Sequence, residues 1–544
     1  MRVLLLSALL ALSAPLAAQS ASLLAERASA SYNAGDYAES GRLYAEAIEA
    51  GARDINNAYN AACAFALAGD EDPAFDFLHL AADLGFANVE LLTTDSDLDA
   101  LHDDPRWPGV VARYEGKAAA AERLWDGPAI PTPFREDLSE DEKVAGLSRL
   151  WSEAKYNFAN FDLVPNLDWD SLYVAMLPRV RETGSTLEYY RVLMETVAHL
   201  RDGHSNVYLP NELAGRMHAR PGLRTRLVEG RVLVTEVVDP ALRDEGLAVG
   251  QEVLQIDGMP VHEYARTRVR PYQSSSTEQD RDVRTYEYSL LTGDEAESVD
   301  LVLASPDGTT LERTVPRLTG DQARALAPAR PAFELDRLPG NVVHVRLTTF
   351  SSPEAADAFE ARFAEIESAD ALILDVRNNG GGNGAVGFRV LCALTDSASI
   401  PTAGWRTRLY RPAYRAWGVG ESMEGNAVGA WPCDDTRHYT GPAAVLTSPR
   451  TFSAAEDFAV AFDLMDAGPI VGEATGGSTG QPLSFRLPGG GSGRVTSKRD
   501  AYPDGTDFVG TGVLPDVPVE PTVEGLRAGR DPVLEAAVEA LRRR

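Results

Sequence analysis

The stretch Ala371-Leu-Ile-Leu-Asp-Val-Arg-Asn-Asn-Gly-Gly-Gly382 decides the fold, because a short apolar run passes directly into two asparagines and three glycines. A continuous apolar run of this length indicates a strand that is buried on both faces. The glycines permit positive φ and the close approach of another chain or a ligand, and their N–H groups can converge on an anion. The stretch therefore predicts a core strand followed by a turn that receives an anion. A purely structural left-handed turn is the alternative.

The length and the first residues of the chain indicate an exported protein of several domains. At 544 residues, with 44% hydrophobic and 24% charged side chains, the chain has a globular composition and the length of three or four domains. Residues 1–18 combine an early arginine, a short apolar run and small residues, which is typical of a secretory signal peptide cleaved near Ala18 or Ser20. The apolar run is too short for a membrane anchor. We expect a periplasmic or secreted protein.

The charge balance and the cysteines narrow the class of protein further. The net charge of −30, from 81 acidic against 51 basic residues, disfavours binding to nucleic acid or to anionic membranes. After the signal peptide no stretch is long and apolar enough to span a bilayer. Three cysteines cannot form a disulfide framework, but an exported protein could pair Cys392 with Cys433. Cys63 lies among alanines and is expected to be a small buried hydrophobic residue.

Residues 22–115 contain an internal repeat with a period of 34 residues. Gly35-Asp36 recurs as Gly69-Asp70, and alanines recur at helical spacing. The pattern resembles the tetratricopeptide repeat, a stack of paired antiparallel helices, and a generic alanine-rich helical bundle is the alternative. Either structure would offer a docking surface for a protein partner. Residues 116–140 contain several prolines and are expected to form a linker.

Two further modules are expected before the last part of the chain. Residues 141–210 show apolar positions at helix-face spacing, which predicts a helical cap that ends near the polar turn Arg201-Asp-Gly-His-Ser205. Residues 220–318 change to short strands around Gly246-Leu-Ala-Val-Gly250. This order resembles a PDZ domain, which binds an extended peptide at the edge of its sheet. Another small β-barrel module is the alternative.

Residues 332–524 predict an α/β layer fold, because strand-like runs alternate with helical stretches. The expected strands are Val342–Leu347, Ala371–Val376, Ala443–Thr447 and Ile470–Gly472. Residues 525–544 are expected to form a C-terminal helix. The whole chain is therefore expected to be a multidomain α+β protein with N-terminal α-helical repeats, a PDZ-like β module and an α/β core.

A serine stands at the start of a helical run in Thr451-Phe-Ser-Ala-Ala-Glu-Asp457, just after the expected strand Ala443–Thr447. At such a position the first amides of a helix point outward, and the N–H of Ala454 would be free to stabilise an oxyanion. This is the arrangement that a serine nucleophile needs. The alternative is structural, because Ser453 could be a helix N-cap that forms a capping box with Glu456.

The order of these motifs resembles the C-terminal processing, or tail-specific, serine peptidases. The motifs that carry the likeness are Ile373–Gly382, Ser453–Glu456, Val471–Gly476 and Gly512–Asp516. Together with the PDZ-like insertion they cover about residues 140 to 522. The resemblance implies a ClpP/crotonase-like peptidase core in which Ser453 is the nucleophile. It also implies that the amides of Gly381 and Ala454 form the oxyanion hole.

One position departs from the Ser/Lys peptidases of this kind. They carry a lysine base in the loop that follows Gly472-Glu473, and here that position is Ser478, with no lysine between Lys155 and Lys498. A serine nucleophile needs a base, because its hydroxyl is a poor nucleophile near neutral pH. Tricorn-like members of the superfamily take a histidine from a turn ahead of the PDZ-like module, which implies His204 as the general base. A surface or capping histidine is the alternative.

The sequence leaves the third catalytic member open. In tricorn-like relatives a glutamate orients the histidine, and the aligned position here is Val509. Asp507 lies two residues earlier, on the same face if this segment is a strand, and is our candidate for the role. Asp202, Glu456 and a water molecule are the alternatives.

Neither a metal nor another cofactor is expected. The eight histidines are scattered, no H-E-x-x-H run occurs, and His199 with His204 lacks the spacing of a zinc pair. The loop from Gly472 to Gly480 lacks the Gly-Lys-Ser/Thr of a phosphate-binding loop. Asp375 and Arg377 are expected to fix the glycine turn rather than to transfer protons.

These features predict an exported serine endopeptidase that hydrolyses polypeptides through an ester on Ser453, with His204 as the general base. The alternative from another class is a catalytically inactive peptide- or ligand-binding protein of the same fold, in which Ser453 is only a helix cap. The distance between Ser453 Oγ and the His204 ring distinguishes the two.

Overall fold

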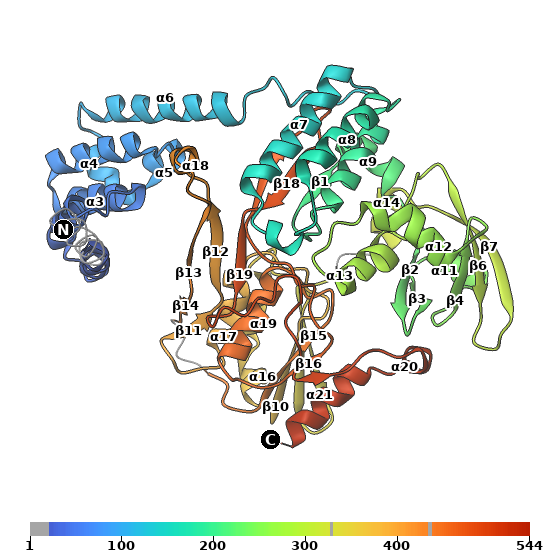
Figure 1. The fold of residues 1–544 in the computed structure, drawn as a ribbon. Helices are drawn as coiled ribbons and strands as arrows, with labels where there is room; N and C mark the ends of the chain where they lie inside the picture. The colour runs from blue at the N-terminus through green and yellow to red at the C-terminus, as the bar shows by residue number, and fades with distance from the viewer. Residues whose placement is uncertain (1–20, 327–329, 434–437, 544) are drawn as a thin grey trace, which may run out of the picture. The chain divides into compact units, whose positions relative to one another are not determined.

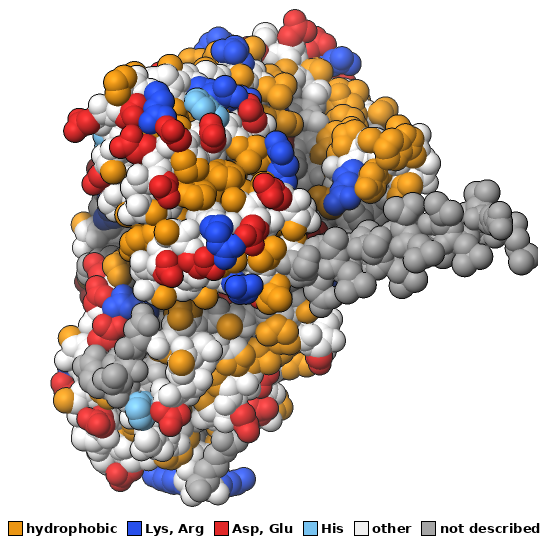
Figure 2. Space-filling model, turned by 90° about the vertical axis from the view of Figure 1, so that its left-hand side faces the viewer, with side chains coloured by type: hydrophobic (Ala, Val, Ile, Leu, Met, Phe, Trp, Pro, Cys, Tyr) orange, Lys and Arg blue, Asp and Glu red, His pale blue; other side chains and the backbone are white. Residues whose placement is uncertain are grey.

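The computed structural model describes residues 21–326, 330–433 and 438–543, and the chain divides into two compact units after Ala129 (Figure 1). The signal peptide expected over residues 1–18 lies outside the described residues. None of the described helices is long and apolar enough to cross a membrane. On the face drawn in Figure 2, acidic side chains are interspersed with basic and hydrophobic ones.

The N-terminal unit consists of helices. The described part of its first helix covers residues 21–33. The next elements are α2 (Tyr37–Glu49), α3 (Ile55–Ala68), α4 (Glu71–Leu84), α5 (Val89–Thr94), the 3₁₀ helix η1 (Ser96–Leu101) and α6 (Trp107–Trp125). Helix α4 begins 34 residues after α2, which is the period of the sequence repeat. Gly69 and Gly85 end α3 and α4 in the left-handed conformation that glycine favours. The assignment to tetratricopeptide repeats stays a prediction.

The linker expected over residues 116–140 is shorter than the sequence indicated, because α6 continues to Trp125. The run Lys117-Ala-Ala-Ala-Ala-Glu122 consists of strong helix formers, and their propensity extends the helix into this region. The prolines that suggested a linker fall after the end of the helix, in residues 126–139.

The second unit begins with a helical cap. Its elements are α7 (Glu140–Asn157), η2 (Phe161–Leu163), α8 (Trp169–Arg181), α9 (Thr186–Ala198), β1 (Asn206–Tyr208), η3 (Asn211–Leu213) and α10 (Ala214–Met217). Ser139 and Glu142 form the capping box that starts α7. Strand β1 pairs antiparallel with β18 (Ser492–Thr496), which also pairs with β17 (Pro482–Arg486). This pairing joins the turn ahead of β1 to a segment near the end of the chain.

A β-module follows, with antiparallel strands in the order β2-β3-β4-β6-β7 and with β5 paired to β4. Its strands are β2 (Leu223–Val228), β3 (Arg231–Val237), β4 (Glu252–Ile256), β5 (Met259–Pro260), β6 (Ser298–Ala304) and β7 (Thr310–Pro316). Its helices are α11 (Pro240–Asp244), α12 (Val261–Tyr264), η4 (Ala265–Val269), η5 (Arg270–Tyr272), α13 (Glu278–Asp282) and η6 (Val283–Tyr288). The likeness to a PDZ domain stays a prediction.

The α/β core is built on a second sheet, in the order β20-β16-β15-β10-β9-β8. Its strands are β8 (Phe333–Leu338), β9 (Val342–Leu347), β10 (Ala371–Asp375), β15 (Ala443–Thr447), β16 (Ile470–Gly472) and β20 (Val517–Pro518), which confirms the four expected strands. All neighbours are parallel except β8 and β9. The carboxyl ends of β10 and β15 therefore meet at one edge, and this edge positions the site.

Helices cover both faces of this sheet, so the apolar run of β10 is buried throughout, as the sequence predicted. The helices that pack on this sheet are α15 (Glu354–Ala361), α16 (Phe363–Glu367), α17 (Gly384–Cys392), α19 (Ala454–Leu464) and α21 (Pro532–Arg542). Of the remaining helices, α14 (Gly320–Leu326) precedes β8, α18 (Pro412–Ala416) belongs to the insertion between α17 and β15, and α20 (Val523–Ala528) packs against the β-module. Leu372 and Leu374 pack in the cluster that includes α17 and α19, whereas Ile373 packs with α21 on the other face.

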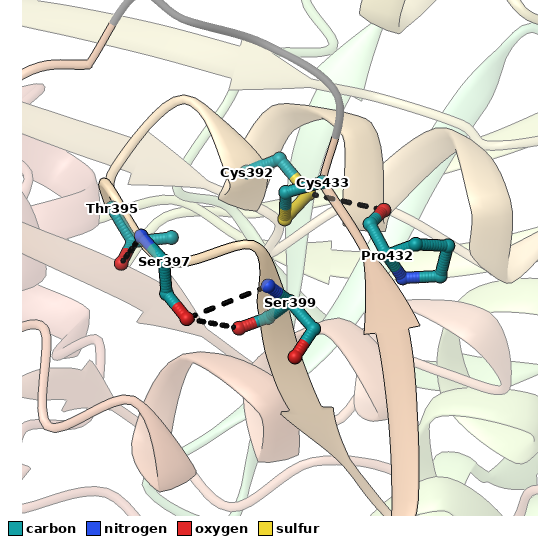
Figure 3. Close-up of a disulfide and its surroundings, with 6 residues drawn as sticks. All are labelled: Cys392, Thr395, Ser397, Ser399, Pro432 and Cys433. Carbon is teal, nitrogen blue, oxygen red and sulfur yellow. Dashed lines mark hydrogen bonds between the residues drawn. A yellow bond between two sulfur atoms is a disulfide. The ribbon is translucent and has the colours of Figure 1, made fainter.

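An insertion between α17 and β15 carries the disulfide. Its strands are β11 (Ser399–Thr402), β12 (Gly404–Leu409), β13 (Ser422–Asn426) and β14 (Gly429–Pro432), and β12 also pairs with β19 (Lys498–Ala501). Cys392, at the end of α17, is bonded to Cys433, just after β14 (Figure 3), which confirms the expected pair. Cys63 is free and buried, as expected.

Opening this disulfide is expected to lower the stability of the core. The two cysteines are 41 positions apart, and closing a loop of this length removes unfolded-state entropy worth about 4 kcal/mol. The variant Cys392→Ala/Cys433→Ala should therefore unfold at lower denaturant concentration, whereas Cys63→Ala should have the smaller effect. Alkylation of the unreduced, denatured protein should modify Cys63 alone. Modification of all three cysteines would contradict the pairing.

Candidate active site

Ser453 occupies a strained turn between β15 and α19. Its φ of 58° and ψ of −128° lie in a region that non-glycine residues avoid, at a cost of about 1–3 kcal/mol. The surrounding loops hold this conformation, because Ser453 N–H donates to Ser478 O at 3.2 Å and Phe452 N–H donates to Asn379 O at 3.0 Å. The serine is thus fixed at the edge where the glycine turn after β10 also ends.

His204 lies between two serine hydroxyls. Its Nε2 is 2.9 Å from Ser453 Oγ, and its Nδ1 is 2.9 Å from Ser478 Oγ. The ring also stacks on Phe452, with the ring centres 4.7 Å apart and the planes 12° from parallel. The structure therefore brings the expected nucleophile and the expected base into hydrogen-bond contact, and it adds a partner that the sequence did not assign.

The electrostatics keep His204 neutral at physiological pH. Burial, followed by the nearby positive charges of Arg494 and Arg284, lowers the pKa of His204 to about 3. A neutral ring that accepts the Ser453 proton at Nε2 carries its own hydrogen on Nδ1, and this N–H then donates to Ser478 Oγ. The ring is thus in the state that a general base requires.

Asp202 anchors the turn that carries His204, and it bonds the backbone of His204 rather than its ring. Its carboxylate accepts hydrogen bonds from His204 N–H, Ser205 Oγ and Asn160 Nδ2, each at 3.0 Å. The carboxylate is buried, and these donors replace the water that it loses. Asp202 therefore shapes the turn and does not orient the ring directly.

Glu456 fixes the two serines on either side of His204. Its buried carboxylate accepts from Ser453 N–H at 3.1 Å, from Gly477 N–H at 2.7 Å and from Ser478 N–H at 2.9 Å. Thr475 Oγ1 donates to it as well, at 2.6 Å. Burial raises the pKa of Glu456 to about 7 in spite of these four donors. The capping expected of Glu456 is therefore present, and it also extends to the Ser478 loop.

Asp507 does not take the place that the sequence suggested. Its two carboxylate oxygens each accept a hydrogen bond from Arg406 at 2.7 Å, and Arg499 lies 3.4 Å away. These arginines project from β12 and β19 and attract the carboxylate, while Ser478 occupies the Nδ1 side of His204. Val509 is buried. The sequence did single out Ser478, as the residue in place of a lysine, but the contact with His204 depends on the folded loop.

Of the two amides expected to form an oxyanion hole, one is open and the other is already hydrogen-bonded in this structure. Ala454 N–H is the first amide of α19 and has no hydrogen-bond acceptor among the described residues. Gly381 N–H instead donates to Asn379 Oδ1 at 2.9 Å, so it is not open as the sequence suggested. The glycine itself lies against the site, because a Cβ added there would be 2.6 Å from Phe452 O and 3.0 Å from Ala454 N. Only glycine fits this approach.

Asp375 and Arg377 support the glycine turn, as expected. Arg377 N–H and Nε–H both donate to Asp375 Oδ1 at 3.0 Å, and His344 Nε2 lies 3.0 Å from Asp375 Oδ2. Burial would raise the pKa of Asp375, but the hydrogen bonds from His344 and Arg377 outweigh it and hold the pKa well below its usual range. Asp375 is therefore an ion-pair partner and not a proton carrier.

One group of possible metal ligands occurs among the described residues, and it lies in the N-terminal unit. Cys63, Asp95 and Asp97 place ligand atoms within 4.8 Å of one another. Tyr59 OH donates to Asp95 at 3.0 Å, and Tyr32 OH donates to Asp97. Burial raises the pKa of the Cys63 thiol, so the thiolate that a metal needs is disfavoured. This cluster is a hydrogen-bonded core contact.

Known proteins resemble this chain over its second unit. Residues 341–519 match peptidase family S41. The chloroplastic C-terminal processing peptidase of Tetradesmus obliquus is 30% identical over 251 residues, which cover 43% of this chain and 48% of the relative. A carboxyl-terminal-processing protease of Picosynechococcus sp. is 28% identical over 351 residues, which cover 61% of this chain and 74% of the relative. The structure of mature CPAF complexed with lactacystin superimposes with a TM-score of 0.57 at 17% identity, over 74% of this chain and 98% of that chain.

The matched segment and the two named relatives support a serine-type peptidase. The likeness to mature CPAF, at 17% identity, shows a shared fold. Residues 341–519 are similar to peptidase family S41, and both relatives are named as C-terminal processing enzymes. The chain spans about half the length of the algal relative.

Removing the Ser478 hydroxyl is expected to slow catalysis without loosening the fold. In Ser478→Ala the Nδ1–H of His204 loses its acceptor in a buried site, which costs about 1–3 kcal/mol and predicts a tenfold to hundredfold fall in kcat with little change in KM. Steady-state hydrolysis of a peptide substrate measures both constants. Ser484→Ala, an exposed serine on β17, is the control. An unchanged kcat in Ser478→Ala would show that Ser478 does not act on His204.

The pH dependence is expected to reflect Glu456 rather than His204. Below about pH 7 Glu456 binds a proton and loses an acceptor site for the Ser453 and Ser478 amides, so the rate should fall as the pH drops through this range. His204 stays neutral well below pH 5 and adds no second step there. Acylation rates measured from pH 5 to 8 should show one transition in the wild type and none in Glu456→Gln. A transition that persists in Glu456→Gln would contradict this assignment.

Proposed function

We propose that this protein is an exported serine endopeptidase in which Ser453 is the nucleophile, His204 is the general base and Ser478 orients His204. The observation that carries the proposal is the chain of two 2.9 Å contacts from Ser453 Oγ through the His204 ring to Ser478 Oγ. A helix cap would not need this contact, because a capping serine bonds the amides of its own helix. Polypeptides are the substrates that the family implies.

The first step forms an ester on the enzyme. Ser453 Oγ attacks the scissile carbonyl carbon while His204 Nε2 takes the hydroxyl proton, and the resulting imidazolium gives that proton to the leaving amine. A water molecule then attacks the ester while His204 Nε2 takes its proton, and His204 returns this proton to Ser453 Oγ as the ester bond breaks and the second product leaves. Throughout, His204 Nδ1–H donates to Ser478 Oγ and keeps the ring in the orientation that Nε2 needs.

The oxyanion of each tetrahedral intermediate would lie at the first amide of α19. Ala454 N–H is open, and the positive end of the helix adds to its effect. Gly381 N–H would join it by exchanging its bond to Asn379 for the stronger bond to a charged oxygen. The substrate would thus complete a hole that is half formed in this structure.

The Ser478 hydroxyl replaces two groups that related peptidases use. It stands where a lysine base is expected, and it faces the nitrogen that a glutamate orients in tricorn-like relatives. We therefore assign this chain to the tricorn-like Ser/His branch, with a neutral hydroxyl as the third member in place of Asp507. A hydroxyl stabilises an imidazolium less than a carboxylate does, so we expect slower acylation than a triad with an acidic member gives.

The location and the partners follow from the other modules. The Cys392–Cys433 disulfide is typical of an oxidising compartment and supports the signal peptide expected over residues 1–18. A periplasmic or secreted location is consistent with both. The PDZ-like β-module would bind substrate segments, and the helical repeats would dock a protein partner.

Fluorophosphonate labelling tests this function, since the probe reacts only with an activated serine. The wild type should be labelled, and a peptide map should place the adduct on Ser453. Ser453→Ala should lose all labelling, whereas Ser422→Ala, an exposed serine on β13, should keep it. Labelling that persists in Ser453→Ala would contradict the assignment of the nucleophile. No labelling of folded wild type would favour the inactive binding protein.

A further inference from the structure

A short segment of the β-module reaches the catalytic loops. Residues Ser274–Gln279, here called the brace, run from the loop after η5 into the first turn of α13. The brace belongs to the β-module by sequence, and its polar side chains bond the backbone of the α/β core and of the cap. These contacts lie outside the set of residues that the mechanism uses.

Two brace residues bond the turn that carries His204. Ser274 Oγ donates to Asp202 O at 2.7 Å, and Gly203 N–H donates to Ser276 Oγ at 3.0 Å. Both polar atoms of the peptide group between Asp202 and Gly203 are therefore bonded by one segment. Because residues 201–205 form no helix or strand, their backbone groups depend on such side-chain partners.

Two other brace residues bond the loop that carries Ser478. Thr277 Oγ1 donates to Gly476 O at 2.8 Å, and Gln279 Nε2 donates to Thr475 O at 3.1 Å. The second hydrogen of the Gln279 amide is used as well, because Nε2 also donates to Thr511 O at 2.8 Å. This loop also lacks regular secondary structure, and the brace holds it together with Glu456 and with backbone bonds such as that from Gly476 N–H to Thr451 O.

The brace is thus a common support for both ends of the bond between His204 and Ser478. The two loops come from distant parts of the chain, and the contact between them spans 274 positions. A hydrogen bond weakens steeply when its atoms move by a few tenths of an ångström, and misplacing a catalytic group by about 1 Å can cost a hundredfold in rate. Small shifts of the brace would therefore change the hydrogen-bond geometry of His204 and lower the rate.

Arg284 extends the same support from η6. Its Nε donates to the buried carboxylate of Asp280 at 2.7 Å, and its Nη2 lies 3.3 Å from Gly203 O. The guanidinium also lies 5.1 Å from the centre of the Phe452 ring, the ring on which His204 stacks. The base is thus supported through its backbone and through its stacking partner by groups of the β-module.

We propose that Ser276, Thr277 and Gln279 are positioning residues, through which the β-module sets the alignment of His204 with Ser453 and Ser478. The proposal rests on the peptidase function proposed above. The β-module would then take part in catalysis indirectly. None of these three side chains contacts Ser453 Oγ, but each bonds a loop that carries His204 or Ser478.

Gln279 offers the sharpest test, since its amide bonds two carbonyls of the core. Gln279→Met keeps the length of the side chain and removes both donors, so kcat and the rate of fluorophosphonate labelling should fall together by about tenfold to a hundredfold, with KM unchanged within about twofold. Gln279→Glu places a carboxylate against the same two carbonyl oxygens, so kcat and the labelling rate should fall further in this variant. The fraction of enzyme labelled at completion should stay that of the wild type in both variants.

Thr277 supplies a rescue experiment and a matched control. Thr277→Val removes the hydroxyl that donates to Gly476 O and should slow labelling, whereas Thr277→Ser keeps the hydroxyl and should restore most of the rate. Thr292→Val is the control, because its hydroxyl donates only to Ser289 O in the same module. A merely structural role would lower the labelled fraction and the melting temperature but leave the rate per labelled site unchanged. Wild-type rates in Gln279→Met and Thr277→Val would overturn the proposal. Failure of the wild type to label would instead refute the peptidase function.

Discussion

The contact between His204 Nε2 and Ser453 Oγ is the interaction on which the rest of the structure depends. It joins residues 249 positions apart, and each partner comes from a different part of the second unit. The histidine lies on the turn between the cap helix α9 and β1, which is fixed by the pairing of β1 with β18. The serine lies at the end of β15, where helices on both faces make the sheet rigid. The cap and the core must therefore be correctly packed before the site exists.

The group that bonds His204 Nδ1 differs from that of most serine triads. Most serine triads stabilise the histidine cation with a carboxylate, but here the partner of Nδ1 is the hydroxyl of Ser478. Two buried carboxylates lie in the network, and neither bonds the ring: Glu456 binds the backbone of both serines, and Asp202 binds the backbone of His204. Burial, together with the charges of Arg494 and Arg284, holds the ring in its neutral form. Proton uptake from Ser453 is then favoured only when the negative charge that develops on the intermediate balances the positive charge of the ring.

The sequence predicted the elements whose signal is local. The apolar run of β10, the strands β9, β15 and β16, and the glycine turn with Gly381 at positive φ are all present, since burial and glycine content decide them. The meeting of Ser453 and His204 was expected from the order of family motifs.

What the sequence did not predict depends on contacts between distant segments. Asp507 pairs with Arg406, and Asn379 Oδ1 accepts a hydrogen bond from Gly381 N–H. No spacing in the sequence indicates either bond. The sequence shows Ser478 at the position where a lysine is expected, but its contact with His204 Nδ1 depends on the folded position of the loop. The length of α6 was underestimated because prolines nearby outweighed its alanine run.

The most direct test of this account is the rate of Ser453 acylation in His204→Ala compared with Lys498→Ala. The loss of His204 should lower the rate at least about a thousandfold, because no other base among the described residues contacts Ser453 Oγ. Lys498→Ala should react at the wild-type rate, because the Lys498 ammonium is paired with Asp500 at 2.7 Å. A fast His204→Ala enzyme, or a slow Lys498→Ala enzyme with its fold intact, would contradict the assignment of the base.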